Sequence, residues 1–284
     1  MADIAAVATA PAPRVATDWD ALSLKLAFGA IAFVGLVFLV APTLIVLITS
    51  FTSAATLKFP PPGYSLRWYA ALFSDEAGQL WTAARNSLVV AVVTTLLSVV
   101  IGTTGALVVA RNRAPWARAL DALLMSPLVL PALAFGFGCL IYLNLIGLAP
   151  SLAFLIVGHT VVCFPYVMRT TVASLAQLDP GLLEASESLG ASRGRTFAKV
   201  IVPLIGKGIA AGAFIAFMAS FDNVPVSLFL ADARTEVLPI HMWQIIDNDL
   251  DVRTAAVSGL LIAFTLVLMI AAERFAGLTR QIGR

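Results

Sequence analysis

Residues 122–168 read ALLMSPLVLPALAFGFGCLIYLNLIGLAPSLAFLIVGHTVVCFPYVM, and this run contains no Asp, Glu, Lys or Arg. At 1.5 Å per residue it would form about 70 Å of helix, roughly twice the hydrocarbon core of a bilayer. The chain must therefore fold back on itself, and Gly147-Leu148-Ala149-Pro150 is the natural turn because Gly and Pro interrupt helices. This stretch alone predicts two membrane spans, at 122–146 and 151–168.

Four further charge-poor runs predict the rest of the membrane domain. They place spans at 26–51, 87–110, 208–231 and 254–272, and Asp222 is the one carboxylate inside any predicted span. The composition agrees, because 60% of the residues are hydrophobic and only 12% are charged, about half the charged share of a soluble domain. The runs are long and continuous, which favours helices over the alternating strands of a β-barrel.

The predicted fold is therefore an all-α integral membrane protein with six transmembrane helices over residues 24–284. Residues 1–23, which are rich in Ala, Pro and Thr, are predicted to form a disordered tail. Six spans leave both termini on one side, and 13 of the 18 Lys and Arg residues fall on that side. Because basic residues concentrate in cytoplasmic segments, the tail and both termini are predicted to be cytoplasmic.

This orientation puts two sizeable segments on the outer side. The first contains FPPPGYSLRWY at 59–69 and a helical pattern that ends near Phe73; it is interpreted as a surface helix that anchors a loop or as a ligand contact. The second, 232–253, is acidic and is interpreted as a solvated surface available to a partner protein. Its Asp247-x-Asp249-x-Asp251 pattern lacks the Gly and Glu that a calcium loop requires, so no metal site is predicted.

The largest cytoplasmic segment, residues 179–203, carries the most informative pattern. It begins with Asp179-Pro180, a capping carboxylate followed by a residue suited to the first helical turn. Apolar residues then recur at helical spacing, and Gly190 ends the helix or lets a partner approach closely. A second short helix is predicted from near Ser192 into the fifth span. A helix pair with an apolar stripe and no membrane to enter requires a partner groove.

This segment resembles the cytoplasmic "EAA" coupling loop of permease subunits of ATP-binding-cassette (ABC) importers. That pattern is Glu-Ala-Ala, three residues, Gly, nine residues, Ile, one residue, Leu-Pro, and the positions that match in register are Glu184, Ala185, Gly190 and Pro203. Ser186 replaces the second Ala, and Val200 and Val202 replace Ile and Leu. The six-span topology extends the resemblance over nearly the whole chain after the tail.

The resemblance implies that the loop fits a cleft on a separate ATPase and transmits its closure to the membrane helices. It also implies two ATPase copies, a second similar permease, an extracytoplasmic solute-binding protein and a place in the bacterial inner membrane. The sequence independently supports an ATPase on a separate subunit, since the 284 residues contain no Gly-x-x-x-x-Gly-Lys-Ser/Thr phosphate loop. No catalytic residue or cofactor is therefore predicted, and a net charge of +2 does not suggest a nucleic-acid partner.

Within that family the chain looks most like permeases of spermidine/putrescine importers. The resemblance lies in the 59–69 segment, in Asn86-Ser87-Leu88 and in Ser220-Phe221-Asp222-Asn223. It implies a polyamine as the solute, with Asp222 either on a cation path or in a packing or gate hydrogen bond. The alternatives are iron or a phosphonate as the solute, or an ion-coupled secondary transporter, which would need repeat halves and more intramembrane charges. An intramembrane enzyme would need a catalytic constellation that the sequence lacks.

The remaining notable residues inside the spans are interpreted as structural. Gly208 and Gly212 form a Gly-x-x-x-Gly pair, which is typical of close helix packing. His159 is interpreted as a packed, hydrogen-bonded residue rather than a ligand, and the two cysteines as small apolar residues. Helix kinks are predicted at the prolines of spans three and four, which are Pro127, Pro131 and Pro165.

Overall fold

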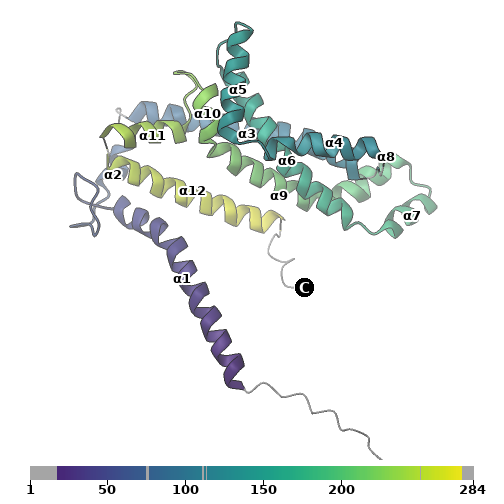
Figure 1. Cartoon of the computed structure of the whole chain (residues 1–284), viewed down its shortest axis with the longest axis horizontal. Coiled ribbons are helices and arrows are strands. Elements are labelled where there is room, and N and C mark those ends of the chain that lie inside the picture. Colours follow the sequence, from purple (N-terminus) through teal and green to yellow (C-terminus); the bar gives the residue numbers. More distant parts are fainter. Residues whose placement is uncertain (1–17, 75–76, 111, 113, 250, 277–284) are drawn as a thin grey trace, which may run out of the picture.

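The computed structural model describes residues 18–74, 77–110, 112, 114–249 and 251–276, and the regular elements among them are helices (Figure 1). The all-α prediction is confirmed for these residues. Most of the predicted tail, 1–23, lies outside the described residues. The first helix, α1 (Asp18–Ser50), begins before the predicted boundary at residue 24.

Five helical stretches are long and apolar enough to cross a membrane, and each overlaps one of the predicted spans. Arg85 and Arg169 lie inside two of them, because a basic residue ends an apolar run without ending a helix. The turn predicted at 147–150 is confirmed, with Gly147 at a φ of +73° just before α6. The helices concerned are α1, α3 (Gly78–Ala110), α6 (Leu152–Ala176), α9 (Val202–Phe221) and α12 (Arg253–Ala276).

The third predicted span, 122–146, is not one helix. The chain forms α4 (Pro115–Met125), a 3-10 turn (Ser126–Leu128) and α5 (Ala132–Leu145), with a bend of 95° between the two halves. Pro127 lies in the turn and Pro131 directly precedes α5. A proline removes one backbone donor and disfavours helix in the residue before it. Two prolines this close therefore break the span, which is a larger effect than the predicted kink.

The centre of the molecule is formed by α3, α6 and α9, which pack against one another. Glycines let their backbones approach closely: a Cβ on Gly102 would stand 2.8 Å from the Phe164 carbonyl oxygen, and one on Gly212 would stand 2.6 Å from the Val167 Cα. A Cβ on Gly208 would stand 2.8 Å from the Thr170 carbonyl oxygen. The close packing predicted for the Gly-x-x-x-Gly pair is confirmed.

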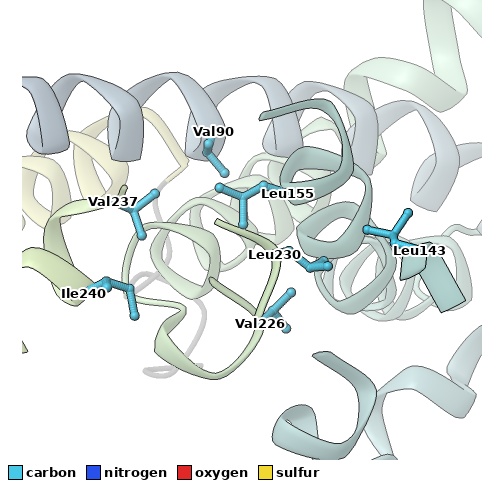
Figure 2. Close-up of a cluster of buried hydrophobic side chains, with 7 residues drawn as sticks. All are labelled: Val90, Leu143, Leu155, Val226, Leu230, Val237 and Ile240. Atoms are coloured by element: carbon cyan, nitrogen blue, oxygen red, sulfur yellow. The ribbon is translucent and has the colours of Figure 1, made fainter. Parts of the chain in front are cut away.

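A second centre of packing joins the shorter helices to this bundle. It brings together α3, α5, α6, α10 (Val224–Leu230) and α11 (Leu238–Asp249), and its members are Val90, Leu143, Leu155, Val226, Leu230, Val237 and Ile240 (Figure 2). Helix α11 was not predicted, because its apolar residues alternate with polar ones in a segment that has no long apolar run. The half-helices α5 and α10 are thus fixed to the bundle through one shared apolar cluster.

Helix α1 diverges from the bundle, and none of the residues in its most apolar window is buried (Figure 1). Its C-terminal end packs against α12 and is held by polar contacts. There the Ser50 hydroxyl lies 2.8 Å from the Tyr69 hydroxyl, and the Trp68 indole nitrogen donates to the Ala54 carbonyl over 3.0 Å. Both aromatic residues belong to α2 (Arg67–Ala71). The 59–69 segment therefore anchors a loop, as one of its two interpretations proposed.

Candidate functional site

The first helix of the 179–203 loop begins as its sequence predicts. Asp179 precedes α7 (Pro180–Ser188), and its carboxylate accepts a hydrogen bond of 2.8 Å from the backbone N–H of Gly181. Pro180 occupies the first helical position, where its missing N–H costs nothing. The capping residue and the proline therefore fix where the helix starts without any help from the rest of the protein.

The helix ends at Ser188, and Gly190 follows two residues later with a φ of +77°. The Gly190 N–H donates to the Glu187 carbonyl over 2.9 Å, and the Ala191 N–H donates to the Ser186 carbonyl over 3.1 Å. These two bonds form a Schellman motif, which favours glycine at its left-handed residue. No described residue lies within 4 Å of the place that a Cβ on Gly190 would occupy, so this surface is open.

The second helix of the loop, α8 (Arg193–Thr196), is tied back to the first by a hydroxyl pair. Ser186 and Thr196 are both buried, and their side-chain oxygens lie 2.8 Å apart. Ser186 stands where the EAA pattern has its second Ala, so this departure supplies a contact that alanine cannot make. Thr196 is not singled out by the sequence pattern, and the available signal is a hydroxyl residue six positions after Gly190.

The outer surface of the helix pair is available to a partner. All four positions that match the EAA pattern are exposed: Glu184, Ala185, Gly190 and Pro203. Beside them Leu189 is 88% exposed, and it lies outside the helical stretches that could cross a membrane. An exposed leucine beside an open glycine is the kind of apolar feature that a protein groove covers.

The helix pair is connected to the membrane bundle by continuous helix. From Arg193 the chain passes through α8 and a π-helical turn (Phe197–Ile201) into α9, and the whole stretch to Phe221 qualifies as one span. A displacement of the loop would therefore be carried directly to the end of α9. Figure 1 shows α7 and α8 at the opposite end of the molecule from α2 and α11.

The fifth span ends earlier than predicted, and this changes the place of Asp222. Helix α9 stops at Phe221, whereas the predicted span, 208–231, continues for ten more residues. Asp222 follows as the C-cap residue with φ −103° and ψ 20°, and it is exposed rather than enclosed in a helix. Asn223 then caps α10, because its side-chain oxygen accepts a bond of 3.1 Å from the Val226 N–H. We call this interruption, residues 222–223, the Asp222 joint.

Residues on both sides of the Asp222 joint contact aromatic rings and one histidine. Phe221 stacks on Phe217 with ring centroids 5.8 Å apart and packs against Phe264 of α12 at 5.7 Å. His159 of α6 is buried, with Nδ1 2.9 Å from the Ser220 hydroxyl and Nε2 3.0 Å from the Ser227 hydroxyl. The interpretation of His159 as a packed, hydrogen-bonded residue is confirmed, whereas its partners were not predictable from local sequence.

The segment that follows α10 is held by residues at the start of span two. The Asn86 amide donates to the Glu236 carbonyl over 2.9 Å, and the Ser87 hydroxyl accepts from the N–H of Leu238, the first residue of α11, over 2.8 Å. The Asn86-Ser87-Leu88 motif thus anchors this loop. In the same loop, hydrogen bonding by Thr235 holds the pKa of Asp232 below its usual range.

Comparison with known proteins assigns the family. A family model described as the inner membrane component of binding-protein-dependent transport systems matches residues 98–281. The spermidine/putrescine transport system permease protein PotC of Escherichia coli K12 is 28% identical over 239 residues, 84% of this chain and 89% of PotC. The molybdenum transport system permease protein ModB of Mycobacterium bovis is 30% identical over 214 residues, 70% of this chain and 80% of ModB.

A solved structure agrees at the level of the fold. A chain of a bacterial ABC transporter that imports the polysaccharide alginate superposes with a TM-score of 0.68, at 14% identity, over 94% of this chain and 99% of its own length. This chain belongs to the family of inner membrane components of binding-protein-dependent transport systems. It is a multi-pass permease subunit of an ABC importer, and therefore a transport component rather than an enzyme.

Proposed function

We propose that this permease subunit forms part of the membrane path for a polyamine such as spermidine or putrescine. The observation that carries the proposal is the Asp222 joint, which places an exposed carboxylate directly after Phe221, whose ring packs against those of Phe217 and Phe264. Polyamines carry several positive charges, and a cation that leaves water is stabilised by carboxylates and aromatic faces. The similarity to PotC supports the same substrate class.

The 179–203 loop docks onto the ATPase subunit in this proposal. Its exposed leucine, Leu189, enters a groove of the ATPase, and the continuous helix from Arg193 to Phe221 carries the motion to the Asp222 joint. The family's dependence on a binding protein supports an extracytoplasmic solute-binding partner. The resemblance in the EAA loop supports two ATPase copies and a second permease chain.

We further propose that the termini and the 179–203 loop lie in the cytoplasm. The bias of basic residues, 13 of 18, supports this orientation. Figure 1 shows α7 and α8 at the opposite end from α2 and α11, so the 59–69 segment and α11 would then face outward. Labelling tests it with a membrane-impermeant thiol reagent, in a background without Cys139 and Cys163. A cysteine at Ser74 should react from outside and one at Ser192 should not; the reverse pattern would invert the topology.

The alternative is the same architecture with another solute, iron or a phosphonate. The similarity to ModB favours keeping it, because the two relatives are described as carrying different solutes at nearly the same identity to this chain. Uptake into proteoliposomes that contain the complete transporter and its binding protein separates the two. Labelled spermidine should accumulate with ATP, and unlabelled putrescine should compete. Transport of a phosphonate, iron or molybdate without spermidine uptake would refute the polyamine assignment and leave the importer assignment intact.

A further inference from the structure

The backbone does not fix the angle between α9 and α10. Within the Asp222 joint the helical ladder is interrupted: the Val224 N–H donates to the Asp222 carbonyl only two residues away, over 3.0 Å. The regular bonds of a helix, which would hold the two segments on one axis, are replaced by local turns. Side-chain contacts must therefore set the position of α10 relative to α9.

His159 makes contacts on both sides of this joint. Its two ring nitrogens point to Ser220, in the last turn of α9, and to Ser227, within α10. All three side chains are buried, with exposed fractions of 1% for His159, 3% for Ser220 and 1% for Ser227. The imidazole is a rigid ring whose two nitrogens point in different directions. It therefore links the two helices at a fixed separation.

His159 can make both hydrogen bonds in its neutral form. A neutral imidazole has one N–H donor and one acceptor nitrogen, and a serine hydroxyl can play either role. One serine therefore donates to His159 while the other accepts, and either tautomer satisfies all three groups. Next to them lie the apolar residues Leu155, Val226 and Leu230, so a hydroxyl that lost this partner would have no water to replace it.

Helix α10 packs directly against α5, so the position of one determines that of the other. A Cβ on Gly136 of α5 would stand 3.0 Å from the Pro225 carbonyl oxygen of α10, and the rings of Phe137 and Phe229 lie 5.6 Å apart. The two half-helices thus meet at backbone distance, and each follows a break in its own span. A shift of α10 about the Asp222 joint would carry α5 with it.

We propose that His159 is a positioning residue for transport: by holding Ser220 and Ser227 together it fixes the Asp222 joint and the α5–α10 pair against α6. The inference rests on the proposed transport function of the joint. His159 does not touch the solute in this role. It determines where the Asp222 carboxylate and the rings beside it stand.

Uptake by the complete transporter tests the transport part of this role. At matched amounts of assembled complex, His159→Leu should lower the maximal rate of spermidine uptake about tenfold with an unchanged KM, which corresponds to about 1.4 kcal/mol. His159→Gln, which restores one donor and one acceptor, should recover most of the rate. Ser227→Ala should lower the rate severalfold alone and add nothing to His159→Leu, because both remove the same contact.

Distances between spin labels test the positioning part independently of the solute. Labels at Leu96 of α3 and Leu228 of α10, in the background without native cysteines, should show a broader distance distribution in His159→Leu. A control pair at Leu96 and Val157, within the α3–α6 core, should be unchanged. Absence of spermidine uptake by the unmutated complex would refute the polyamine assignment, and these distances would still decide the role of His159.

A purely structural role gives a different result. His159→Leu would then lower the yield or thermal stability of the complex, while assembled complexes kept the parent uptake rate and the parent distance distribution. That outcome would overturn the proposal. If His159→Leu fails to assemble, Ser227→Ala removes a single hydroxyl and is judged by the same two measurements.

Discussion

The 179–203 loop and the Asp222 joint each connect two helices, and they are held in opposite ways. At Gly190 the bonds run between residues close in sequence: a capping carboxylate, a Schellman motif and the Ser186–Thr196 pair. At Asp222 the decisive contacts come from His159, a residue of another helix 61 and 68 positions away from its partners. The 179–203 loop is exposed and is held by hydrogen bonds among its own residues, so it can present a fixed shape to a partner. The Asp222 joint is held by a residue of α6, so its geometry can respond to movement of the bundle.

The largest expected effect on uptake comes from placing a charge on the 179–203 loop. Gly190→Asp should reduce uptake by on the order of a hundredfold or more, because docking would bury an unpaired carboxylate at a cost of about 3–5 kcal/mol. Gly190→Asn is the matched control, since asparagine tolerates the same left-handed backbone without the charge. Solute uptake and co-purification with the ATPase are measured for both variants at equal membrane expression. Parent uptake by Gly190→Asp would contradict docking at this surface.

A smaller effect on uptake is expected from a change in the Asp222 joint. Asp222→Asn keeps the shape of the side chain and removes its charge, so spermidine uptake should fall about tenfold if the carboxylate stabilises a cation on its path. ATP hydrolysis stimulated by the binding protein should persist, because the 179–203 loop is untouched. The matched control is Asp121→Asn, a carboxylate of α4 outside the 232–253 surface, which should leave uptake near the parent rate. Equal uptake by both variants would remove the charge of Asp222 from the transport path.

The smallest effect is expected from the hydroxyl pair inside the loop. Ser186→Ala restores the alanine of the EAA pattern but leaves the Thr196 hydroxyl buried without its partner, at a cost of about 1–2 kcal/mol. Thermal unfolding of the purified complex should shift down, and uptake should fall no more than about threefold. Adding Thr196→Val should recover much of the stability, because both polar groups are then removed together. Strict additivity of the two changes would show that the pair does not interact.

The same contrast explains what could be predicted from the sequence. Apolar runs of membrane length gave the spans, and Asp179-Pro180 and Gly190 gave the ends of α7, because these signals act on their own neighbours. Two spans were predicted wrongly, the single helix at 122–146 and the span through 231, and in both the chain breaks without leaving the apolar run. Hydropathy does not distinguish a continuous helix from two half-helices joined by a capping asparagine or a proline turn.

Contacts between distant residues were beyond local sequence signals. Asn86-Ser87 was noted as a resemblance, and the structure supplies its physical role, which is to hold the loop before α11. The 59–69 segment was interpreted as an anchor or a ligand contact, and the structure shows the hydroxyl of its Tyr69 beside Ser50 at the end of α1. The sequence could suggest that His159 is hydrogen-bonded, but its partners lie on helices whose packing no periodic pattern specifies.

A photo-crosslinking residue in place of Leu189 tests most directly whether the 179–203 loop docks onto the ATPase. In the complete transporter, irradiation should join this chain to the ATPase subunit, and Gly190→Asp should abolish the product. The same photo-crosslinking residue in place of Leu228 of α10 should give no ATPase product. A complex that takes up solute at the parent rate, yet whose position 189 never reacts with the ATPase, would contradict the docking of this loop.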